Sequence, residues 1–284
     1  MPKKIQFADK YDIINAATPN HKKSYTVIPH REVIDNTINL LNASGFVITD
    51  EQYRCTDEAQ IAQGIYYIKP KNNYSDPNLN SETELGMMFA WLNSYNKRIR
   101  FQCAIGGYVL VCNNGMCAGD MMSYARKHTG SANFDARMQI SNQIKSAEKF
   151  YKRLVDDKRN MKNITLDKQT QSELLGRLYA EENILETSHL STVKKEMINP
   201  SYDYQCDQEN AWVFYNHVTH ALKKSHPTSW LSDLQKFHEF YTSNVLSSMG
   251  INPTDNPSSI PEEAANAAAD IEAQDFFTMG NYKI

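Results

Sequence analysis

The apolar residues of this chain change their spacing at Asn113-Asn114-Gly115, and that change limits the folds open to it. Between Gly45 and this point, apolar residues alternate with polar ones or run together over short segments, as they do in β-strands. After it, they recur every three or four residues, as on one face of an α-helix. Strands that come first and helices that follow predict an α+β fold rather than a parallel sheet.

The first part of the chain predicts one helix and an antiparallel β-meander. The helix follows Pro29 and ends at Gly45, and its apolar residues share one face. Residues 69–84 are rich in Asn, Ser and Pro, which indicates a loop. We expect Gly106-Gly107 to form the turn before the last strand. The expected strands are residues 46–53, 61–68, 85–92, 99–105 and 108–112.

The second part of the chain predicts helices that pack on this sheet. The first apolar stripe contains Phe134, Met138, Ile144, Ala147, Tyr151 and Leu154, which we expect to be buried together. Further helices are expected around residues 174–185, 212–222 and 230–245. The predicted architecture is therefore an N-terminal helix and a β-meander followed by a C-terminal helical half.

Four regions follow from this pattern. We expect a flexible N-terminal arm over residues 1–24, a sheet domain over 25–130, a helical region over 131–250, and an acidic, mostly disordered tail over 251–284. The tail contains Asp275, Phe276 and Phe277, which join an acid to two large apolar residues. They are either part of a disordered terminus or a short motif that binds a host or phage protein.

The composition predicts a cytoplasmic protein that does not enter a membrane. Apolar residues make up 41% and charged residues 22% of the chain, as in ordinary globular proteins. The chain contains no run of about 20 apolar residues and does not begin with a secretion signal. Its five cysteines lack a repeated spacing, which argues against a disulfide framework and fits a reducing compartment.

The motifs of common cofactor and metal sites are missing from the sequence. It contains neither a phosphate loop nor a dinucleotide-binding glycine motif, so we expect no cofactor. Cys112 and Cys117 have no matching second pair, and His217 and His220 have no glutamate at zinc-protease spacing, so we expect no metal. His128 is the best candidate for a chemical role, but without an assignable partner it predicts no catalytic centre.

The charge is unevenly distributed along the chain, although the net charge is only -3. Residues 97–162 contain thirteen Lys and Arg against five Asp and Glu, and residues 255–284 contain six acids and one lysine. Cations bind phosphates and aromatic rings stack on bases, so this segment predicts a nucleic-acid site. A solvated basic surface and buried tyrosines are the alternative interpretation. The candidate residues are Lys97, Arg98, Arg100, Arg126, Lys127, His128, Lys145, Lys149, Lys152 and Arg153, with Tyr95 and Tyr108 as stacking rings.

One central block carries a resemblance to a known family. It joins Asn93-Ser94, a strand pair, the element Val111-Cys112-Asn113-Asn114-Gly115 and the later His128-Thr129-Gly130. This arrangement resembles the domain of unknown function 932 family of phage and plasmid proteins. Residues 25–46 and, more weakly, 203–222 resemble other parts of that family. The resemblance implies an origin on mobile genetic elements and an architecture, but little chemistry.

The order of helix, glycine-aromatic turn, β-meander and long helix also resembles the topology of single-strand annealing proteins, an analogy that does not transfer function by itself. We therefore expect a non-catalytic protein that binds or anneals single-stranded DNA, or RNA, as a homo-oligomer during recombination or replication. The alternative is a phage protein that inhibits or triggers a host defence component. An enzyme such as a nuclease would need acids around a divalent ion, which the spacing does not locate.

Overall fold

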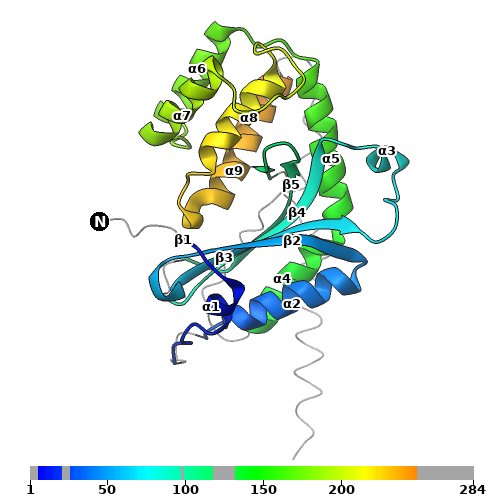
Figure 1. Ribbon diagram of the computed structural model, residues 1–284, viewed down its shortest axis with the longest axis vertical. Helices are drawn as coiled ribbons and strands as arrows, with labels where there is room; N and C mark the ends of the chain where they lie inside the picture. Colours follow the sequence, from blue (N-terminus) through cyan, green and yellow to red (C-terminus); the bar gives the residue numbers. More distant parts are fainter. Residues whose placement is uncertain (1–5, 21–25, 97–98, 118–131, 248–284) are drawn as a thin grey trace, which may run out of the picture.

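The computed structural model describes residues 6–20, 26–96, 99–117 and 132–247. The described strands form one antiparallel sheet whose order follows the sequence, and helices pack on both of its faces (Figure 1). The predicted α+β fold is thus confirmed. The strands are β1 Gln6–Phe7, β2 Phe46–Cys55, β3 Ile61–Pro70, β4 Leu85–Ser94, β5 Gln102–Val109 and β6 Asn114–Met116.

The prediction of a turn at Gly106-Gly107 is wrong, because both glycines lie inside β5. A Cβ atom at Gly106 would lie 2.3 Å from the backbone oxygen of Met116, and one at Gly107 would lie 3.0 Å from Leu154. These glycines therefore permit close approach of neighbouring elements rather than a change of chain direction. The turn comes later, at Asn113, whose φ is 55°, and residues 114–116 add strand β6 instead of ending the sheet.

Helices cover the two faces of the sheet in separate groups. Helices α2, α4 and α5 pack on one face, where the Ile105 backbone N–H donates to the side chain of Gln143 in α4. Helices α8 and α9 pack on the other face, and α6 and α7 lie beyond them (Figure 1). The helices are α2 His30–Ala43, α3 Pro77–Asn80, α4 Ala132–Lys145, α5 Ala147–Lys162, α6 Lys168–Ala180, α7 Thr187–Ile198, α8 Ala211–Leu222 and α9 Pro227–Tyr241. A short 3-10 helix spans Asp57–Ala59, and a π-helical segment, Thr242–Leu246, follows α9.

The sheet region and the helical region share one hydrophobic core. A single cluster of buried residues includes Phe89 and Trp91 of the sheet together with Tyr151, Trp212 and Phe237 of the helices. Each region buries its apolar face against the other, so the two predicted regions depend on one another for stability.

The described part of the predicted N-terminal arm is ordered by contacts with the sheet. Strand β1 pairs with β2, and helix α1 (Lys10–Ile14) begins at Asp9, whose side chain accepts a hydrogen bond from Tyr11 N. Ile13 is fully buried, and Lys10 forms an ion pair of 2.9 Å with Glu51. A short capped helix with one anchoring side chain does not give a periodic apolar pattern, which is why the sequence did not indicate it.

The structure describes only part of the residues on which two expectations rest, namely the acidic tail and the lack of membrane-spanning helices. The acidic tail, including Asp275, Phe276 and Phe277, falls outside them. Within the described ranges, none of the helices combines the length and apolar character that a membrane span needs.

Candidate functional site

The predicted basic residues occupy different environments. Five of the candidates lie outside the described residues, namely Lys97, Arg98, Arg126, Lys127 and His128. Arg100 is exposed just before β5, and Lys145 and Lys149 are exposed on the two sides of Ser146, where α4 ends and α5 begins. These three described cations are open to an external partner.

Lys152 and Arg153 face carboxylates of the protein itself. The Lys152 ammonium lies 3.1 Å from Asp76 and 3.2 Å from Asp156, and these bonds raise its pKa. The Arg153 guanidinium lies 3.9 Å from Asp157 and is largely buried. Both cations are thus partly neutralised before any nucleic acid could approach, which leaves them less available than the sequence predicts.

The next cations of α5 also form internal ion pairs. Lys158 lies 2.6 Å from Glu82 and 3.1 Å from Glu84, and Lys162 lies 2.5 Å from Glu84. Burial would raise the pKa of Glu84, but its hydrogen bonds to Lys162 and Lys158 outweigh that effect and lower the pKa. The later part of α5 therefore ties the loop between β3 and β4 to the helical half.

Tyr95, one of the two predicted stacking residues, belongs to the protein interior. Its side chain is only 4% exposed, and its hydroxyl accepts a hydrogen bond of 2.8 Å from the backbone N–H of His30. The rings of Tyr95 and His30 stack with their centroids 3.8 Å apart. This ring packs against α2 and presents no free face to a base.

Tyr108, the other predicted stacking residue, is half-buried on the face of the sheet that carries α8 and α9. Its ring meets the ring of Tyr67 edge to face at 4.5 Å and lies over Gly86. Burial raises the pKa of Tyr108, so its hydroxyl stays neutral under ordinary conditions. Tyr108 lies on the side of the sheet opposite to Lys145 and Lys149, so the structure does not bring these predicted residues together.

A different aromatic residue accompanies the exposed cations. Phe134 and Met138 were predicted to be buried, but their side chains are 62% and 44% exposed. They share one face of α4 with the exposed residues Arg137 and Lys145, at spacings of three, four and eleven residues from Phe134. We call Phe134, Arg137, Met138, Lys145 and the adjoining Lys149 the α4–α5 face.

The break between α4 and α5 explains the wrong prediction for Phe134 and Met138. The Ser146 N–H is shared between the backbone oxygens of Asn142 and Gln143, and the helix changes course there. In α4 the residues buried against the sheet and α2 are Ala132, Ala136, Ile140, Gln143 and Ile144. The stripe that runs from Phe134 through Leu154 in the sequence is therefore not continuous in space.

The α4–α5 face is electropositive. Within the described ranges, no carboxylate lies at ion-pair distance from Arg137, Lys145 or Lys149. Glu148, the acid nearest in sequence to Lys145 and Lys149, accepts hydrogen bonds from the backbone N–H of Asp76 at 2.9 Å and from Ser75 at 3.1 Å. Its charge is directed toward the β3–β4 loop, so an exposed aromatic ring and three cations remain for an external anion.

A buried polar cluster joins the β5–β6 hairpin to α8. The Asn114 amide donates to the backbone oxygen of Asn216 at 3.0 Å and to its side-chain oxygen at 3.2 Å. The Tyr204 hydroxyl lies 3.5 Å from the same amide. Two separate blocks that carry the family resemblance, residues 111–115 and 203–222, thus meet at this cluster.

Cys112 and His217, the titratable residues beside this cluster, are held in neutral forms. Burial raises the pKa of the Cys112 thiol, so it does not exist as the thiolate that acts as a nucleophile. Burial lowers the pKa of His217 to about 4, and neither of its ring nitrogens has a hydrogen-bond partner in the described structure. The arrangement connects elements of the fold and does not assemble a nucleophile with a base.

Ser225, His189 and Asp233 also approach one another near the start of α9, but their geometry does not suit catalysis. His189 Nδ1 accepts a hydrogen bond from the backbone N–H of Glu186, which places the ring proton on Nε2. Nε2 faces the Ser225 hydroxyl at 3.4 Å and cannot take its proton. His189 therefore serves as part of the α7 cap.

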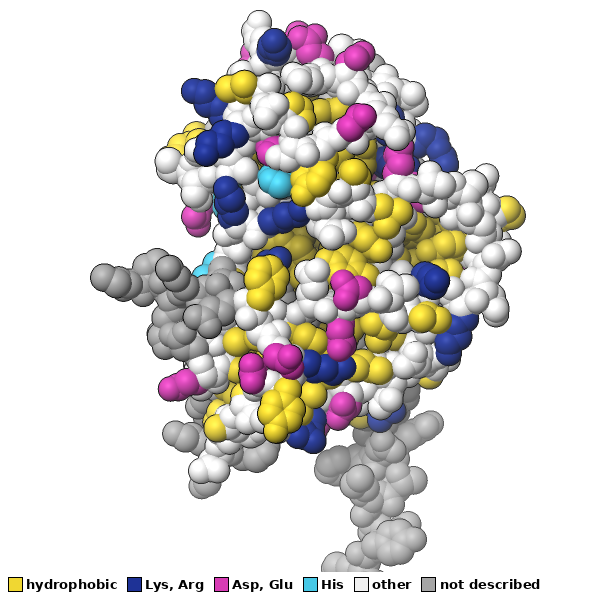
Figure 2. Space-filling view, viewed as in Figure 1, with side chains coloured by type: hydrophobic (Ala, Val, Ile, Leu, Met, Phe, Trp, Pro, Cys, Tyr) yellow, Lys and Arg dark blue, Asp and Glu magenta, His cyan; other side chains and the backbone are white. Residues whose placement is uncertain are grey.

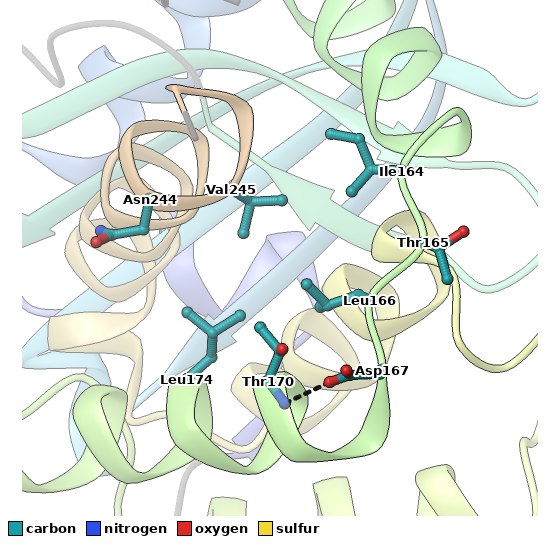
Figure 3. Close-up of a pocket in the computed structure, with 8 residues that line it drawn as sticks. All are labelled: Ile164, Thr165, Leu166, Asp167, Thr170, Leu174, Asn244 and Val245. Carbon is teal, nitrogen blue, oxygen red and sulfur yellow. Dashed lines mark hydrogen bonds between the residues drawn. The ribbon is translucent and has the colours of Figure 1, made fainter. Parts of the chain in front are cut away.

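A hollow of about 260 Å³ lies where the α5–α6 loop meets the turn after α9 (Figure 3). Its lining includes the aliphatic side chains of Ile164, Leu166, Leu174 and Val245. The Asp167 carboxylate at its rim accepts a hydrogen bond of 2.7 Å from Thr170 N and caps α6. This lining supplies no set of catalytic groups.

The described residues contain no group of three His, Cys, Asp or Glu placed to hold a metal ion.

Among comparisons with known proteins, a family model described as a domain of unknown function, DUF932, matches residues 20–245. Neither a curated protein nor a solved structure matches the chain.

Proposed function

The chain belongs to the domain of unknown function 932 family, and on that premise we propose that it is a non-catalytic protein that binds single-stranded nucleic acid. The observation that carries the proposal is the α4–α5 face, where the exposed Phe134 ring lies on the same surface as Arg137 and Lys145. The setting that fits this activity is recombination or replication of a mobile genetic element.

The α4–α5 face offers both components of single-strand binding. Cations bind the sugar-phosphate backbone with little regard to sequence, because binding releases condensed counterions. Aromatic side chains add stacking energy of about 1–3 kcal/mol per base. Phe134 supplies a ring that is 62% exposed, and Arg137, Lys145 and Lys149 supply the charges.

The size of this face favours an assembly of several copies. From Phe134 to Lys145 the helix rises by about 16 Å, at 1.5 Å per residue. A contact of that length holds only a few nucleotides, so one copy binds weakly. Several copies along one strand raise occupancy without any new type of contact. We therefore propose a homo-oligomer as the active form.

A binding titration with charge-reversed variants tests the proposal. We would measure the fluorescence anisotropy of a labelled poly-dT 30-mer, and of its RNA counterpart, as the full chain is added at low salt. The variant Lys145→Glu/Lys149→Glu should bind at least tenfold more weakly than the wild type, because two phosphate contacts become repulsive. The matched control Lys168→Glu/Lys236→Glu changes the same charge at exposed positions elsewhere and should bind within twofold of the wild type.

Two outcomes would contradict the proposal. The first is that wild-type protein fails to bind either oligonucleotide at low salt. The second is that both double variants weaken binding equally, which would indicate a response to net charge alone. Loss of self-association in Phe134→Ser, combined with failure to bind DNA or RNA, would instead identify the α4–α5 face as a protein contact.

A further inference from the structure

Arg54 occupies an unusual position on the face of the sheet that packs against α9. Its guanidinium lies between two aromatic rings, those of Phe7 and Trp230, with each ring centroid 5.5 Å away. Trp230 is 4% exposed and closes the site on the side of α9, whereas Phe7 is 78% exposed and lies toward solvent. Burial lowers the pKa of Arg54, which reflects the cost of removing this cation from water.

The residues that the structure describes do not neutralise this charge. Among the residues that the structure describes, no carboxylate lies at ion-pair distance from Arg54, and its Nε–H has no hydrogen-bond acceptor. Lys158, which is buried, has two glutamates within 3.1 Å. A half-buried cation without a counter-ion among the described residues is costly, so its retention there favours a site that accepts a negative partner.

Two side chains next to Arg54 carry polar atoms without partners among the described residues. Gln63 lies directly opposite Arg54 in the β2–β3 register, so the two side chains project from the same face of the sheet. Gln63 is fully buried, and neither its Nε2 nor its Oε1 has a partner in the described structure. The Trp230 Nε1–H is also buried, without an acceptor in the described part of the chain. Three side chains from β2, β3 and α9 therefore carry hydrogen-bond donors that no described residue accepts.

A second cation lies near enough to Arg54 to be affected by its charge. Lys223, at the end of α8, donates a hydrogen bond to the backbone oxygen of Cys112. Burial lowers the pKa of Lys223, and the nearby positive charge of Arg54 lowers it further. In Figure 2 the surface is recessed where the helical layer meets the sheet, with apolar and basic side chains beside each other along the recess.

We propose that Arg54, Gln63 and Trp230 form a binding site for the phosphate group of a nucleotide. A phosphate oxygen accepts several hydrogen bonds at once, and the planar guanidinium fork matches its geometry. The exposed ring of Phe7 offers a stacking surface for the base. This site lies on the opposite face of the sheet from the α4–α5 face, so it is additional to the proposed strand-binding surface.

Calorimetric titration of the full chain with three probes tests the site. We expect saturable binding of inorganic phosphate and tighter binding of dAMP. A poly-dT 30-mer should displace dAMP if the site binds the phosphates of a strand, and should not displace it if the site binds a free nucleotide. Arg54→Gln keeps the length and polarity of the side chain but removes its charge, and it should weaken phosphate and dAMP binding at least tenfold. Trp230→Phe keeps a ring, removes the indole N–H and should weaken binding severalfold.

Matched controls separate this site from the strand-binding proposal. Arg31→Gln removes the charge of an exposed arginine on α2 and should bind dAMP as the wild type does. Lys145→Glu/Lys149→Glu should lose oligonucleotide affinity and keep dAMP affinity. Thermal unfolding of Arg54→Gln should occur at or above the wild-type temperature, because a costly charge is gone. Such a result shows that the variant folds. Absence of saturable phosphate and dAMP binding in the wild type, or unchanged binding in folded Arg54→Gln, would overturn the proposal.

Discussion

Asn114 in β6 and Asn216 in α8 are 102 residues apart in sequence, yet the side-chain amide of the first donates to the backbone oxygen of the second at 3.0 Å. Both side chains are fully buried. The contact fixes the β5–β6 hairpin against the helical half, and it joins two of the blocks that carry the family resemblance. Buried polar groups cannot form hydrogen bonds with water, so they need an internal partner of this kind.

Replacement of Asn114 by alanine should destabilise the protein by about 1–3 kcal/mol, because Asn216 Oδ1 would remain buried without its donor. Urea unfolding monitored by circular dichroism measures the change in the free energy of unfolding. The control Asn39→Ala removes an exposed asparagine from α2 and should change stability by less than about 0.5 kcal/mol. Equal stability of the two variants would show that the Asn114 contact contributes little.

His217 should make the protein less stable at mildly acid pH. Its pKa is about 4 in the folded state, against 6.5 for an ordinary histidine. Between these values the unfolded chain binds the extra proton, so the contribution of His217 to stability is complete above about pH 6.5 and is lost as the pH falls toward 4. Through this group the free energy of unfolding should change by at most about 1.4 kcal/mol per pH unit. Replacing His217 with leucine should flatten the dependence over this window, measured by urea unfolding at each pH.

Glu84 should contribute a second loss of stability at lower pH. Its pKa is lowered in the folded protein, where Lys162 and Lys158 bind the carboxylate. The ion pairs therefore stabilise the fold above the ordinary glutamate pKa of 4.5 and lose that effect as the pH falls through the lower folded value. Glu84→Gln should be less stable than the wild type at pH 7 and approach it below pH 4. Glu182→Gln, an exposed control, should follow the wild type throughout.

Phe134 should matter for binding but not for folding. Its ring is 62% exposed, so Phe134→Ser should change the free energy of unfolding by less than about 0.5 kcal/mol. Loss of one stacking contact should cost about 1–3 kcal/mol of affinity for single-stranded DNA. Tyr179, which is 43% exposed on α6, provides the control Tyr179→Ser. A large drop in stability with unchanged DNA affinity would assign Phe134 to the fold instead.

The central strands could be predicted because their apolar runs are buried on both faces. β3 and β4 are almost entirely buried along their length, and both were located from the sequence. β5 was divided in error because a glycine pair normally indicates a turn. Here Gly106 accommodates Met116 of the neighbouring strand β6, and Gly107 accommodates Leu154 of α5. Such close approaches leave no local signal that distinguishes them from turns.

The candidate site was only partly predictable for a similar reason. Lys145, Lys149 and Lys152 look equivalent in sequence, but Asp76 from the β3–β4 loop pairs with Lys152 alone. Helical spacing also places Phe134 with Tyr151, because it assumes a straight helix through Ser146. Arg54 was not identified because an isolated arginine in a strand carries no motif, and its environment depends on Phe7 and Trp230.

The salt dependence of oligonucleotide affinity tests the account most directly. The logarithm of the binding constant for a poly-dT 30-mer should fall linearly with the logarithm of salt concentration, with a slope of about -0.7 for each neutralised phosphate. Lys145→Glu/Lys149→Glu should reduce the steepness of this slope by about 1.4, whereas Lys168→Glu/Lys236→Glu should leave it unchanged. A wild-type affinity that is independent of salt, or a slope that is the same in the Lys145/Lys149 variant, would contradict the assignment of the α4–α5 face to single-stranded nucleic acid.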